Sequence, residues 1–166
     1  MSEKRLVIDE IELNYSGLFD IHGFLKTIDT ITKDRGYVKN EKERKEKITQ
    51  TGKEIFYELR PVKRKTAFFV LMIKLRIAIN NMKDVEVRRD QKKVMLHEGD
   101  IKILFDAWTT TDYEFRWEQK PIYYFLRNLI ERVFYKVHTD RFLDELVDDA
   151  HFFHRNIKAY LNAHRF

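Results

Sequence analysis

The chain contains no cysteine, only 5 glycines and 2 prolines, and no apolar run longer than seven residues. Without cysteine there is no disulfide framework, thiolate metal site or thiol nucleophile. The longest apolar run, from Ala67 to Ile73, is far too short to span a membrane, and the residues after Met1 lack the apolar core of a signal peptide. We therefore expect a cytoplasmic protein without a membrane span.

The residues that are present predict a compact globular protein. Hydrophobic residues make up 43% of the 166 residues and charged residues 36%. Abundant Lys, Glu and Arg without cysteine is also a composition typical of thermophile proteins. The length predicts one domain, 1–166, that can bury a substantial core.

Opposite charges gather in two parts of the sequence. The stretch 33–65 has 12 basic and 6 acidic residues, whereas the segment 140–149 has five acidic residues and one arginine. The two could attract each other within the chain or between chains, or each could bind a partner.

Hydrophobic periodicity predicts strands in the first two thirds of the chain. We expect a strand at 6–15, a helix from Ser16-Gly17 to Gly36, and a charged edge strand at 40–47. Thr51-Gly52 is typical of a hairpin tip, and a turn is expected at 60–65. Further strands are expected at 67–79, 85–87, 94–96 and 101–108. Asn80-Asn81 is expected to break the first of these, and a charged turn at 89–91 to join the next two.

The last quarter of the sequence reads as helix. Apolar residues recur at spacings of three and four from Pro121 to Val137, and again from Leu143 to Leu161. A helical region covering 121–164 is too long for a domain of this size, so a kink or break is expected near 138–140. One helix is enough to cover the sheet, which leaves 140–166 as a surplus helix that folds back or pairs with another chain.

The fold class is therefore α+β, with a curved antiparallel sheet of about six to seven strands wrapped around a long C-terminal helix. This order resembles the START-like helix-grip superfamily, although only one helix is expected between the first two strands, where that family usually has two. The stretch 112–121 also resembles uncharacterised archaeal hypothetical proteins, and this resemblance implies no activity.

An aromatic cluster at the junction of the last strand and the long helix is the leading candidate site. The candidate pocket residues are Trp108, Tyr113, Phe115, Arg116, Trp117, Tyr124 and Phe125. Such a set could hold an apolar or aromatic ligand between sheet and helix, or could simply anchor the helix on the sheet, which the sequence favours.

A basic hairpin is the alternative site, for nucleic acid or the ribosome. Its candidate residues are Lys42, Arg44, Lys45, Lys47, Arg60, Lys63, Arg64 and Lys65. Interleaved glutamates also fit an ordinary solvated surface.

Catalytic and metal-binding patterns are poorly represented. Asp112, Glu114 and Glu118 lack a histidine or nucleophile at a supporting spacing. Asp144, Asp148 and His151 share a helical stripe with Arg155, which would repel a metal ion. We therefore expect a non-enzymatic binding protein without a cofactor or metal. The alternatives are a nucleic-acid- or ribosome-associated factor and a structural protein that dimerises through its surplus helix.

Overall fold

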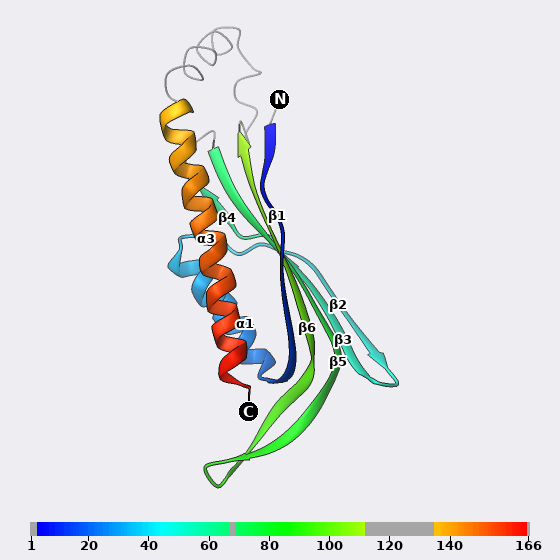
Figure 1. The fold of residues 1–166 in the computed structure, drawn as a ribbon. Helices are drawn as coiled ribbons and strands as arrows, with labels where there is room; N and C mark the ends of the chain where they lie inside the picture. The colour runs from blue at the N-terminus through cyan, green and yellow to red at the C-terminus, as the bar shows by residue number, and fades with distance from the viewer. Residues whose placement is uncertain (1–2, 67–68, 112–134, 166) are drawn as a thin grey trace.

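The computed structural model describes residues 3–66, 69–111 and 135–165. Its elements are β1 (Glu3–Phe19), α1 (Ile21–Asp34), β2 (Glu41–Thr49), β3 (Gly52–Leu59), β4 (Val62–Arg64), β5 (Phe69–Arg89), β6 (Lys92–Thr111) and α3 (Tyr135–Ala163). The described strands form one curved antiparallel sheet, and α1 and α3 lie together on one side of it (Figure 1). The expected α+β class and C-terminal helix are confirmed.

The sheet has six strands in the order β1-β6-β5-β3-β2, with β4 paired to β5. The first strand of the chain therefore pairs with the last described one, and Tyr15 lies opposite Ile101. The charged edge strand and its hairpin are also confirmed, because β2 turns into β3 between Thr49 and Gly52. The expected turn at 60–65 is partly wrong, since three of its residues form β4 against β5.

The core lies between the sheet and the two helices. Alternate residues of β5 point to this side, and Leu71, Ile73, Leu75, Ile77 and Ile79 are all fully buried. This part of β5 is matched in register by β6, where Leu75 lies opposite Phe105. Alternation of this kind places one full row of side chains on one face of a sheet, and this row forms the floor of the core.

The expected strand break at Asn80-Asn81 is wrong. Strand β5 continues to Arg89, and its register with β6 shifts between Asn80 and Lys83, which is a β-bulge. Asn81 takes a positive φ of 55°, a conformation that asparagine adopts more readily than most residues. A bulge absorbs the extra residue and lets the ladder resume.

Helix α1 begins later than the sequence suggested. Strand β1 continues through Gly17, and Asp20 caps the helix by accepting hydrogen bonds of 3.1 Å from the backbone N–H groups of His22 and Gly23. The helix ends at Asp34, and Gly36 follows with a φ of +74°, which agrees with its expected role as the stop.

Helix α3 supplies the roof of the core. Its apolar stripe, Leu146, Ala150, Phe153, Ile157 and Leu161, is between 0% and 1% exposed. The segment after residue 140 therefore packs on the sheet and α1 of its own chain, which agrees with the expected fold-back rather than with pairing to another chain. The helix also runs without interruption through 138–140, so the expected break is not there. Residues 121–134 lie outside the described part.

Two hairpins extend beyond the helices, and the β5–β6 hairpin reaches furthest (Figure 1). At its end, the five residues Val85–Arg89 pair with Lys92–Leu96, and the described sheet has no third strand beside them. We call these paired residues the ribbon. The charged turn expected at 89–91 is confirmed, with Asp90 and Gln91 at positive φ values of 48° and 65°.

Candidate functional site

Lys63 of β4 and Lys65, which follows this strand, contact the acidic segment of α3. Lys63 Nζ lies 2.5 Å from Glu145 Oε1 and 3.2 Å from Asp149 Oδ2, and Lys65 Nζ lies 2.8 Å from Glu145 Oε2. Although partial burial opposes ionisation, the hydrogen bonds from both lysines lower the pKa of Glu145 below its usual value. The attraction between the basic and acidic regions thus operates within the chain, and it occupies two lysines of the basic hairpin.

Asp149 is the buried centre of this ion cluster. Its carboxylate is 1% exposed and accepts a 2.9 Å hydrogen bond from the Tyr37 hydroxyl, while Arg35 lies 3.3 Å away. Burial of the tyrosine and the negative charge of Asp149 both raise the pKa of Tyr37. The phenol therefore stays protonated at neutral pH, and the cluster joins α1, β4 and α3.

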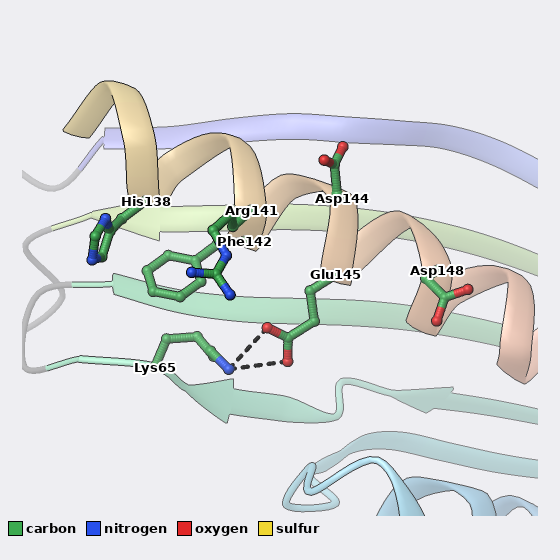
Figure 2. Close-up of a pocket in the computed structure, with 7 residues that line it drawn as sticks. All are labelled: Lys65, His138, Arg141, Phe142, Asp144, Glu145 and Asp148. Atoms are coloured by element: carbon green, nitrogen blue, oxygen red, sulfur yellow. Dashed lines mark hydrogen bonds and ion pairs between the residues drawn. The ribbon is translucent and has the colours of Figure 1, made fainter. Parts of the chain in front are cut away.

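An open groove of about 600 Å³ lies beside this cluster, along the N-terminal half of the described α3. Its lining residues are Lys65, His138, Arg141, Phe142, Asp144, Glu145 and Asp148. Figure 2 shows Lys65 reaching across to both oxygens of Glu145, while Asp144 and Asp148 point elsewhere. The lining holds both cations and carboxylates, so the charge of the groove does not select a ligand of one sign.

The acidic stripe considered for a metal does not gather into a site. Asp148 Oδ2 accepts a hydrogen bond of 3.2 Å from Arg35, which fixes it toward α1. Among the described residues, no group of three His, Asp or Glu side chains could hold a metal ion. The carboxylates Asp112, Glu114 and Glu118 lie outside the described residues.

The aromatic candidate pocket is described at only one of its seven residues. Trp108 alternates along β6 with Phe105 and Ala107, which are buried against the helix side of the sheet. Its side chain therefore lies on the opposite face, and its expected place between sheet and helix is wrong. The other six, Tyr113, Phe115, Arg116, Trp117, Tyr124 and Phe125, lie outside the described residues.

The basic hairpin does not form one continuous positive surface. Arg44 is paired with Glu46 at 2.7 Å, Arg60 with Glu58 at 2.5 Å, and Lys45 with Glu43. Lys42 and Lys47 lie on the exposed strand β2, whereas Lys63 and Lys65 face α3 and Arg64 lies on β4. The candidate residues are thus divided between β2 and the region around β4, and most of their positive charges are paired with carboxylates.

The tip of the ribbon carries a basic group that sequence reasoning missed. Arg88 lies directly opposite Lys93, and Arg89 opposite Lys92, on either side of the turn. All four side chains are exposed. Like charges placed directly opposite each other destabilise a strand pair, and the ion pair of Lys93 with Glu86, at 3.0 Å, offsets part of this cost. The signal in the sequence was the charged turn itself, which was considered only as a connection.

None of the described helices is long and apolar enough to cross a membrane. No family model matches the chain, and no curated protein matches it in sequence.

Proposed function

We propose that the chain binds duplex nucleic acid through the ribbon. The observation that carries the proposal is the cross-strand register of cations at its tip, where Arg88 lies opposite Lys93 and Arg89 opposite Lys92. Facing cations repel each other in the free protein, and the ion pair of Lys93 with Glu86, at 3.0 Å, offsets part of that repulsion. Phosphates placed beside the tip would offset more of it. The overall charge of +5 and the isoelectric point near 9.3 favour the same partner.

The shape of the ribbon fits a duplex. Its five paired residues on each strand extend for about 17 Å at the usual rise of a β-strand. A two-stranded ribbon of this kind can enter the major groove of DNA, which is about 12 Å wide. Proteins that use it contact phosphates from the strand edges and bases from the inserted face.

A duplex suits the ribbon better than a single strand. Residues 80–104 contain no Phe, Tyr or Trp, so the ribbon has no aromatic platform on which unpaired bases could stack. Charge–phosphate contacts therefore have to supply most of the affinity.

We also propose that the fold is a helix-grip arrangement. Its support is the pairing of β1 with β6 and the position of α3 on the helix-covered face of the sheet. The ligand-binding alternative has less support, because the layer between sheet and α3 is filled by side chains such as Phe105, Phe153 and Ile157, each fully buried.

The test is a binding titration with fluorescent duplex DNA, duplex RNA and single-stranded DNA. Reversing two tip charges, Arg88→Glu with Lys92→Glu, should weaken duplex binding and reduce the slope of log K against log salt by about two, because each lost phosphate contact removes about 0.9. The matched control, Lys26→Glu with Lys158→Glu, changes two exposed lysines of α1 and α3 by the same charge.

Equal weakening in the control would show that net charge alone drives binding. Wild-type protein that binds no duplex at low salt would overturn the proposal. Reversal of Arg44 and Lys45 on β2 compares the ribbon with the basic hairpin, and a larger effect there would move the interface to β2.

A further inference from the structure

A small hollow lies on the face of the sheet opposite the helices. Its volume is about 110 Å³, and its lining residues are Lys4, Arg60, Met72, Lys74, Trp108 and Thr110. These residues come from neighbouring strands, since Thr110 pairs with Lys4 and Trp108 pairs with Met72. Three cations line the hollow, and its lining includes no carboxylate.

The lining cations are only partly neutralised. Arg60 donates to Glu58 at 2.6 Å, but Lys4 and Lys74 have no ion pair among the described residues. Asp106, which lies opposite Lys74 in the strand register, is already bound to Arg76 at 2.9 Å and to the backbone N–H of Glu10 at 3.0 Å. The hollow therefore carries an excess of positive charge.

The indole nitrogen of Trp108 gives a second, independent indication. Its Nε1 atom is buried and has no hydrogen-bond partner within the described part of the chain. A buried donor without an acceptor is rare in folded proteins, and it often marks the place of a water or an ion. Indole nitrogen can only donate, so the missing partner must be an acceptor.

We propose that this hollow binds the oxygen atoms of a phosphate group. Lys4 and Lys74 supply the charge, Trp108 supplies a donor, and Thr110 adds a hydroxyl at the wall. The volume is that of about three or four waters at roughly 30 Å³ each, which suits one tetrahedral oxyanion. It is well below the 300 Å³ or so of a typical pocket for a larger organic ligand.

The phosphate could belong to a free ion or to a nucleic-acid backbone, and the test separates the two. The probe is the indole N–H resonance of Trp108 in ¹⁵N-labelled protein, identified by its loss in Trp108→Phe. The chain has two tryptophans, so Trp117→Phe assigns the same resonance if Trp108→Phe does not fold. Inorganic phosphate, chloride at equal ionic strength, and duplex DNA are titrated separately.

A saturable shift of this resonance with phosphate but not with chloride supports the proposal and assigns a free ion. A shift with duplex DNA alone supports a phosphate-binding hollow and identifies the phosphate as that of a nucleic-acid backbone. Lys4→Met with Lys74→Met should raise the dissociation constant at least about tenfold, because a hydrogen bond to a charged group contributes at least that factor. Lys83→Met, a control on β5 remote from the hollow, should leave it unchanged.

The proposal is overturned if phosphate, chloride and DNA move the resonance equally or not at all. It is also overturned if the double lysine variant keeps wild-type affinity. The variant Arg88→Glu with Lys92→Glu should lose DNA binding by the ribbon but should still bind free phosphate in the hollow. The two proposals can therefore be disproved independently.

Discussion

Tyr37 donates a 2.9 Å hydrogen bond to Oδ2 of Asp149, a residue 112 positions later in the chain. Lys63 lies 3.2 Å from the same oxygen, and Arg35 lies 3.3 Å from the other. One buried carboxylate thus holds the segment after α1, the short strand β4 and helix α3 in fixed positions. Removing one partner of a buried charge leaves its desolvation cost uncompensated.

Tyr37→Phe should lower the free energy of unfolding by about 1–3 kcal/mol, because Asp149 loses a hydrogen bond in a buried place. Tyr160→Phe removes the same hydroxyl from a partly buried bond of 3.1 Å to the Asp20 carbonyl, and should cost less, about 0.5–1.5 kcal/mol. Urea unfolding of both variants checks the order. Equal losses of unfolding free energy would mean that the bond to the buried Asp149 carboxylate is no stronger than an ordinary partly buried hydrogen bond.

Glu145 should make stability fall in acid. Its folded pKa lies below the ordinary value of 4.5, so the folded state holds fewer protons than the unfolded state around that pH. The resulting stabilisation is present above about pH 4.5 and is lost as the pH falls through the lowered pKa. Glu145→Gln should flatten this part of the profile, measured by urea unfolding at a series of pH values.

The control for this pH dependence is Glu98→Gln, which changes an exposed carboxylate of β6. It should keep the wild-type loss of stability in acid. A Glu145→Gln profile parallel to wild type would show that Lys63 and Lys65 do not hold this carboxylate in solution.

Phe153→Ala should cost about 3–5 kcal/mol, because the side chain is fully buried between α3 and the sheet and its loss leaves a cavity. Lys158→Ala on the same helix is exposed and should change stability by less than about 0.5 kcal/mol. Chemical denaturation measures both. A loss below about 1 kcal/mol for Phe153→Ala would place α3 outside the core.

Gly52→Ala should destabilise the β2–β3 hairpin. Gly52 has a φ of +148°, and an added Cβ would lie 2.8 Å from the carbonyl oxygen of Met82. We expect a loss of more than about 1 kcal/mol in thermal or urea unfolding. Gly36→Asn is the contrast, because Gly36 is at +74° with no atom closer than 3.8 Å to a Cβ, and asparagine tolerates that region. A larger loss at Gly36 would contradict the hairpin geometry.

Local patterns were sufficient to predict much of the fold. The alternation along β5 identified its buried row, including Leu71 and Leu75, because strand periodicity depends only on neighbouring residues. The same rule, applied to β6, already places Trp108 on the other face from Phe105. The candidate pocket nevertheless grouped Trp108 with the aromatic residues that follow it, and this grouping conflicts with the strand periodicity.

Other features needed the tertiary structure. Two helical segments both carry apolar stripes, and periodicity alone does not say which surface a stripe covers, so the packing of Phe153 on the sheet and α1 could not be predicted. Asn80-Asn81 was interpreted as a break because a bulge and a strand end use similar residues. The bond from Tyr37 to Asp149 joins distant positions, and no local spacing encodes it.

The central claim is that the ribbon is the nucleic-acid interface, and its most direct test is NMR mapping. Backbone amide resonances of ¹⁵N-labelled full-length protein are followed while duplex DNA is added at low salt. The account predicts that the largest shifts fall on the ribbon, Val85–Arg89 and Lys92–Leu96. Largest shifts on β2 or around the groove of α3, or no shifts at saturating DNA, would contradict it.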